Sequence, residues 1–146
     1  MDQTQKLLQS VVENARSGLD ACEQLLGKVT DGGMRGELMT QRAQYQNFAQ
    51  DAEKALYAAG GRPHRKNPLE RVGMWMGVEM NTMTDVTPSH IADMLIQGAT
   101  MGIVGMTKDR NDLPEADANA QGIASSFITA QQENIEKLKG YLTAAN

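Results

Sequence analysis

The sequence predicts an all-α fold, an antiparallel four-helix bundle formed by a single domain over residues 1–146. Three observations carry this prediction. Apolar residues recur at spacings of three and four along most of the chain, which is the period of an amphipathic helix. No stretch shows the strict apolar and polar alternation of a half-buried strand. Short first and last connections around a longer middle one fit a bundle of four long helices.

The first two predicted helices are joined by a short turn. Apolar positions from Leu8 to Leu26 predict a helix over residues 5–28. Residues 29–33 end in two glycines and form the turn, after which the same period predicts a second helix over residues 34–59. Gly60 and Gly61, followed by Pro63, provide the C-terminal stop, because proline cannot continue a helix.

The third helix is predicted in two pieces. Residues 67–70, Asn-Pro-Leu-Glu, have the pattern of an N-cap, a proline at the first position and an acid in the first turn. This helix is interrupted near Asp85, because Thr87 and Pro88 form a new cap and first position. The second piece covers residues 88–108. The last helix opens at residues 112–115, Asp-Leu-Pro-Glu, and turns Phe127, Leu138 and Leu142 inward.

Composition narrows the classes of function. The net charge is -4 with both signs interspersed, so neither nucleic acid nor an anionic membrane surface is an expected partner. The N-terminus lacks the pattern of a signal peptide and no apolar run reaches the roughly 20 residues of a membrane span, so we expect a cytoplasmic protein. The single cysteine, Cys22, lies among apolar residues and is expected to be a buried hydrophobe.

A family resemblance rests on two segments of the second predicted helix and its end. They are Gln-Arg-Ala-Gln-Tyr-Gln-Asn-Phe at residues 41–48 and Gly-Gly-Arg-Pro at residues 60–63. Together with the order of the elements and the interrupted third helix, they resemble the ferritin-like bundles of a bacterial family of unknown function. The resemblance covers nearly the whole chain. It implies a ferritin-like four-helix bundle.

Ferritin-like proteins that bind two metals use a Glu from each of two helices and a Glu-x-x-His motif from each of the other two. This sequence contains no Glu-x-x-His. The positions that the resemblance matches to the ligands hold Ser17-Gly18-Leu19, Gln41-x-x-Gln44, Gln97-Gly98 and Gln131-x-x-Asn134. Neutral amides do not supply the negative charge that two divalent ions need. We therefore expect neither a di-metal centre nor another cofactor.

Glycines are concentrated in the third helix. An interior glycine costs a helix about 0.8 to 1 kcal/mol relative to alanine, so close approach of another surface is the usual compensation. That surface is another helix of the bundle, a second copy of the chain, or a small molecule, and the sequence leaves all three open. The glycines are Gly73, Gly77, Gly98, Gly102 and Gly105.

Methionines are concentrated in the same region. Met is an adaptable core residue and is also used on surfaces that repack against partners, and core packing is the favoured interpretation. Thioethers also bind Cu(I), so a soft-metal site is an alternative. Its donors would be Met76, Met80, Met83, Met94 and Met101.

One basic loop is a candidate anion site, because it precedes the predicted cap of the third helix. It contains Arg62, His64, Arg65 and Lys66. Its cluster is too small, and too poor in aromatic residues, to indicate nucleic-acid binding. A solvated loop is the favoured interpretation.

These patterns favour a non-catalytic, homo-oligomeric binding or structural protein, with a dimer as the expected assembly. Its contact surface, or a cavity for an unidentified small molecule, would be formed by the third-helix glycines with Met76, Met80, Met83 and Met101. The alternative is a storage or redox bundle that binds metal. A third possibility is an enzyme with a cavity around Glu79 and Gln97.

Overall fold

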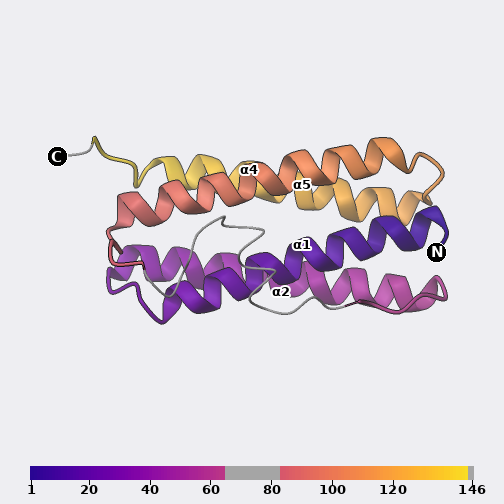
Figure 1. The fold of residues 1–146 in the computed structure, drawn as a ribbon, viewed down its shortest axis with the longest axis horizontal. Helices are drawn as coiled ribbons and strands as arrows, with labels where there is room; N and C mark the ends of the chain where they lie inside the picture. Colours follow the sequence, from indigo (N-terminus) through magenta and orange to yellow (C-terminus); the bar gives the residue numbers. More distant parts are fainter. Residues whose placement is uncertain (65–82, 145–146) are drawn as a thin grey trace.

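The computed structural model describes residues 1–64 and 83–144. These residues form four helices and no strand: α1 (Gln3–Leu26), α2 (Gly32–Ala58), α4 (Pro88–Asp112) and α5 (Ala118–Lys139). Figure 1 shows them side by side as one elongated bundle. The prediction of an all-α four-helix bundle is confirmed. The first piece of the predicted third helix lies outside the described residues, except Met83, which is not helical.

The bundle consists of two antiparallel hairpins. Figure 1 shows α1 running against α2, and α4 running against α5. α4 begins at the end of the bundle where α2 also begins, so α2 and α4 run in the same direction. Within each hairpin the two helices pack closely, and α5 also contacts α1 and α2. No helix in the described part of the chain has the length and apolarity needed to cross a membrane.

Side-chain caps fix the helix starts. Asp2 forms a capping box with Gln5, and Asp31 accepts a hydrogen bond from the Met34 amide at 2.9 Å. Thr87 caps α4 with Pro88 in the first turn, as the sequence predicts. The predicted stop of α2 is confirmed as well. Gly60 adopts a φ of 82°, which glycine tolerates best, and the following amide returns to the Leu56 carbonyl.

The predicted start of the last helix is wrong. Asp112 is the last residue of α4, and Asp117 is the N-cap of α5, where its side chain accepts a hydrogen bond from the Ala120 amide at 2.8 Å. The residue before a proline avoids the helical region, and Leu113, which precedes Pro114, leaves it with φ -123° and ψ 58°. Leu142 is also not inward but 43% exposed, because α5 ends at Lys139.

The core is formed by residues from all four described helices. Near its centre, the Phe127 ring of α5 lies 5.4 Å from the Phe48 ring in an edge-on arrangement and 6.3 Å from the Tyr45 ring. Cys22 is fully buried, as expected. Burial raises the pKa of its thiol to about 12, although the nearby Arg42 charge opposes the change. The thiol therefore remains protonated near neutral pH.

Candidate functional site

Two pairs of polar residues from α2 and α5 meet inside the bundle. The Tyr45 hydroxyl donates a hydrogen bond to Gln131 Oε1 at 2.9 Å, and Asn134 Nδ2 donates to Gln44 Oε1 at 3.0 Å. Gln41 is buried beside them and donates to Glu37 Oε1 at 3.2 Å. We call Gln41, Gln44, Tyr45, Gln131 and Asn134 the interior amide layer. Its four amides are the residues that the resemblance matches to metal ligands on these two helices.

Gly18 of α1 makes room for the aromatic member of this layer. A Cβ atom at residue 18 would lie 2.6 Å from Tyr45 Cζ, closer than real Cβ atoms approach other atoms. Burial also raises the pKa of the Tyr45 phenol above its ordinary value, so the hydroxyl stays neutral and donates its hydrogen bond to Gln131. The sequence identifies Gly18 only as a position without a carboxylate. Its contact with Tyr45 depends on the distance between helices, which no local pattern reveals.

The chemistry of the amide layer does not fit a di-metal centre. Its oxygen donors are neutral, whereas two divalent ions in a buried site need carboxylates to balance their charge. Residues 1–64 and 83–144 contain no group of three or more His, Cys, Asp or Glu side chains placed to hold a metal ion. Asn134 Oδ1 is buried without a hydrogen-bond partner in the described structure. A neutral acceptor of this kind suits a water molecule better than a metal ion.

Gly102 and Gly105 of α4 are not required by packing against the described residues. A Cβ atom at Gly102 would lie 3.8 Å from Phe127 Cε1 and 4.0 Å from Asn14 Oδ1, which are ordinary contacts. A Cβ atom at Gly105 would meet nothing within 4 Å. Gly98 is buried in the same helix. The other two glycines of the predicted surface, Gly73 and Gly77, lie outside the described residues.

The methionines that the structure describes are divided between the core and the surface. Met94 is buried and Met83 is packed against the core, whereas Met101 is 53% exposed. The described donors of the proposed soft-metal site therefore do not all face one interior space. Met76 and Met80 lie outside the described residues.

Met101 instead belongs to an exposed apolar surface. Val104, also exposed, follows it on α4, and the half-buried Gly105 lies next to them. We call Met101, Val104 and Gly105 the α4 face. The side chain of Gln97, proposed above as part of an enzyme cavity, is exposed on the same helix, and its proposed partner Glu79 lies outside the described residues.

The described half of the basic loop is held through its backbone. Gln9 of α1 accepts a hydrogen bond from the His64 amide and donates one to the His64 carbonyl, both at 3.0 Å. This fixes the chain after α2 against α1. Arg62 is exposed, and Arg65 and Lys66 lie outside the described residues, so the anion site stays a prediction.

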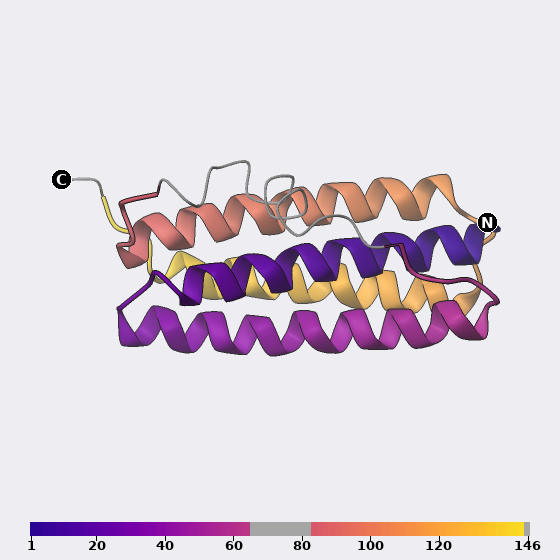
Figure 2. The same ribbon diagram turned by 60° about the horizontal axis from the view of Figure 1, so that its bottom comes forward.

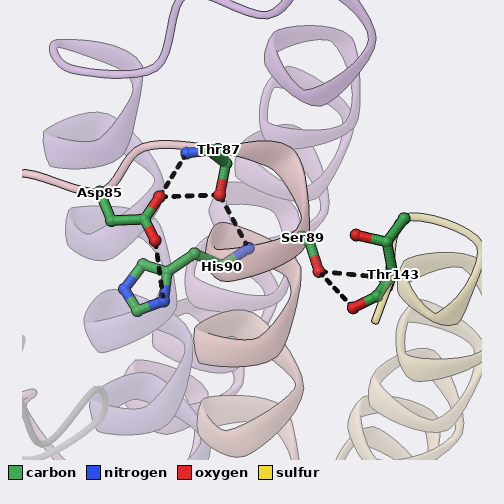
Figure 3. A network of polar contacts seen from close by, with 5 residues as sticks. All are labelled: Asp85, Thr87, Ser89, His90 and Thr143. Atoms are coloured by element: carbon green, nitrogen blue, oxygen red, sulfur yellow. Dashed lines mark hydrogen bonds and ion pairs between the residues drawn. The ribbon is translucent and has the colours of Figure 1, made fainter. Parts of the chain in front are cut away.

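A surface pocket of about 670 Å³ lies at the N-terminus of α4. Asp85 accepts hydrogen bonds from the Thr87 amide at 3.0 Å and from its hydroxyl at 2.7 Å, as Figure 3 shows. These two bonds hold the pKa of the Asp85 carboxyl below its ordinary value. His90 Nδ1 lies 4.0 Å from Asp85 Oδ2. The pocket is lined by Asp85, Thr87, Ser89, His90, Asp93, Leu142, Thr143 and Ala144.

The C-terminal segment closes one side of this pocket. The Thr143 amide donates to Ser89 Oγ at 3.0 Å, which joins the segment after α5 to the first turn of α4 (Figure 3). The sequence analysis does not predict this pocket, because it extends the last helix to Leu142 and turns that side chain into the core. In the structure α5 ends at Lys139. The Thr87-Pro88 cap was the available signal, since it places Ser89 and His90 in a first helical turn.

No protein-family model and no curated protein sequence matches the chain. Two solved structures have a similar fold. The DUF305 fragment from Deinococcus radiodurans matches with a TM-score of 0.74 and 15% identity, over 96% of this chain and 95% of that one. The bacterioferritin-related protein from Bacteroides fragilis, described as a dodecameric thioferritin, matches with a TM-score of 0.73 and 16% identity, over 94% of this chain and 84% of that one. The chain therefore has the fold of the ferritin-like helical bundles.

Proposed function

We propose that this chain is a non-catalytic, homo-oligomeric binding or structural protein built on a ferritin-like bundle. The interior amide layer is the observation that carries the proposal. Between α2 and α5, Tyr45, Gln131, Asn134 and Gln44 form hydrogen bonds that link the two hairpins through neutral groups. Such a network helps to specify how helices dock and provides no redox-active or Lewis-acid group.

The α4 face supports the homo-oligomeric part of the proposal. Met101 is 53% exposed and Val104 is 48% exposed, side by side on one helix. Clustered exposed apolar residues mark contact surfaces more often than isolated ones do. The bacterioferritin-related protein of similar fold is described as dodecameric, which shows that a bundle of this shape can assemble. A dimer is the smallest closed assembly and the one that we expect first.

Native mass spectrometry tests the proposal when it is combined with elemental analysis of the same sample, purified without chelators. We expect an oligomer without stoichiometric iron, manganese or copper. A monomer at all concentrations would contradict the assembly. Stoichiometric metal would contradict the metal-free role, and copper lost in a Met94→Leu, Met101→Leu variant would support the soft-metal alternative instead.

A further inference from the structure

The exposed side of α2 carries no charge over four turns of helix. Solvent-facing helix surfaces are usually rich in charged residues. On α5, for example, Lys139 pairs with Glu136 on the exposed surface. The exposed α2 residues between 36 and 50 are instead small, apolar or amide-bearing, and we call them the α2 face. They are Gly36, Met39, Thr40, Ala43, Gln46, Asn47 and Gln50.

The α2 face has the spacing of a helix-packing seam. Gly36, Ala43 and Gln50 recur every seven residues, and Tyr57, which is 57% exposed, continues the line. A Cβ atom at Gly36 would meet nothing within 4 Å, so no contact within the described chain requires glycine there. Beside this line Met39 is 52% exposed. The small residues Gly36 and Ala43 allow a second helix to approach closely. The side-chain amides of Gln46, Asn47 and Gln50 provide hydrogen-bond donors and acceptors on the same face.

We propose that the α2 face pairs with the same face of a second copy of this chain, antiparallel, about a two-fold axis at Ala43. This inference rests on the homo-oligomeric function proposed above and adds a second contact surface for the assembly, separate from the α4 face. Figures 1 and 2 both place α2 and α4 on opposite sides of the bundle.

Charges at the two ends of α2 favour the antiparallel arrangement. Asp31 and Lys54 lie twelve residues before and eleven residues after Ala43, so antiparallel pairing brings Lys54 of one copy near Asp31 of the other. A two-fold axis repeats this opposite-charge contact. Parallel pairing would place each charged residue next to the same residue of the second copy, and these like charges repel each other.

The geometry of α2 suits such a contact. Its 27 residues form a helix about 40 Å long. In Figure 2 it lies along the lower edge of the bundle, with α1 and α5 above it. A second α2 is thus able to lie along it without displacing a described helix.

An Ala43→Glu variant tests the contact by placing two like charges at the axis. Residue 43 is exposed and glutamate is a good helix former, so the monomer fold is expected to persist. We expect the dissociation constant for self-association, measured by sedimentation velocity over a concentration series, to rise by about tenfold or more. Gln132→Glu adds the same charge on an exposed turn of α5 and serves as the matched control, with no change expected.

Chemical cross-linking provides a second, positive test. In an Ala43→Cys variant the new thiols of two copies would lie next to each other at the axis. The buried Cys22 does not compete, because its pKa is raised to about 12. A short bis-maleimide is expected to join Ala43→Cys chains into covalent dimers and to leave a Gln132→Cys control largely monomeric.

The outcomes separate this inference from the proposed function. An oligomer that survives Ala43→Glu, and whose Ala43→Cys form resists cross-linking, would overturn the α2 contact and leave the homo-oligomeric function standing. A wild-type chain that remains monomeric at all concentrations would overturn both. Dissociation by Ala43→Glu, with efficient cross-linking at residue 43, would support both.

Discussion

Gly18 shows how one residue without a side chain positions a polar group in the core. The Tyr45 ring occupies the space where a Cβ atom of residue 18 would lie, and its hydroxyl thereby reaches Gln131 on α5. Other helical glycines, such as Gly122, have open space around the same position. The two kinds of glycine look alike in the sequence and differ only in what packs against them.

A Gly18→Ala substitution is expected to destabilise the protein. The added methyl group would lie 2.6 to 2.7 Å from three atoms of the Tyr45 ring, which is buried in the core. We expect the free energy of unfolding to fall by about 1 to 3 kcal/mol, a typical cost of overpacking. Gly122→Ala is the matched control and should keep or gain stability by up to about 1 kcal/mol. Urea denaturation of both variants checks this, and equal stability changes would contradict it.

Cys22 is expected to be unreactive in the folded protein. Its thiol is fully buried, and burial raises its pKa to about 12, so little thiolate forms at pH 8. A thiol reagent at pH 8 should modify Cys22 only at the rate of unfolding, and rapidly in denaturant. The raised pKa also means that this residue's contribution to stability is complete below the thiol pKa of the unfolded chain, about 8.5, and is lost as the pH rises towards 12. Rapid labelling of the native protein would contradict this account.

The residues of the amide layer could be found from the sequence, but their contacts could not. Gln41, Gln44, Gln131 and Asn134 were identified because neutral amides stand where the resemblance calls for ligands. The structure brings Gln44 and Asn134 together at 3.0 Å. In the sequence, Tyr45 is only one residue of the predicted helix over 34–59. Its hydrogen bond to Gln131 depends on the relative rotation of α2 and α5.

The helices themselves follow closely from local signals. Asp31 is the N-cap of α2 and Thr87 is the N-cap of α4, and both are residue types that favour this position. Gly60, with its positive φ, follows the end of α2, where glycine is the usual residue. The start of α5 was misplaced because two segments have cap-like character. Residues 112–115 combine an aspartate, a proline and a glutamate, whereas Asp117 is followed by Ala-Asn-Ala and has a weaker local signature. Tertiary contact decides between them, since the Asp117 amide donates to Thr4 of α1 at 2.9 Å.

An Asp117→Ala substitution is expected to weaken α5, whereas Asp112→Ala is expected to be nearly neutral. Asp117 accepts the Ala120 amide at 2.8 Å, and loss of an N-cap side chain costs about 1 kcal/mol. Asp112 is exposed at the end of α4, where a negative charge does not favour the helix dipole. Thermal unfolding of the two variants measures the difference. A larger loss for Asp112→Ala would mean that the helix begins where the sequence pattern suggested.

At the scale of the whole molecule, the two hairpins are joined at both ends as well as in the core. At one end, Tyr141 after α5 donates to the Gly33 carbonyl of α2 at 3.2 Å. At the other, α1 holds the loop between α4 and α5. The sequence predicts four helices and their order, yet these cross-hairpin contacts join residues more than 100 positions apart. Local periodicity carries no information about them.

Replacing both Gln3 and Thr4 by alanine is expected to loosen the loop between α4 and α5. Gln3 Oε1 accepts the Glu115 amide at 2.7 Å and Thr4 Oγ1 accepts the Asp117 amide at 2.9 Å. Each exposed bond contributes about 0.5 to 1.5 kcal/mol, so we expect hydrogen exchange at these two amides to accelerate by about tenfold. The Asp2 and Gln5 capping box remains intact in this variant, which keeps α1 helical.

Lys6→Ala, an exposed substitution in the same turn of α1, is the control and should leave exchange in the loop unchanged. If the double variant also left exchange at Glu115 and Asp117 unchanged, the first turn of α1 would not hold the second hairpin. The hairpins would then depend for their docking on the core, the interior amide layer and the contact between Tyr141 and Gly33 at the other end. If the faster exchange is confined to the Glu115 and Asp117 amides, the hydrogen bonds to Gln3 and Thr4 stabilise only the loop. If it spreads along α5, the N-terminal residues stabilise the docking of the whole second hairpin, because amides throughout a helix exchange together only when the helix opens as a unit.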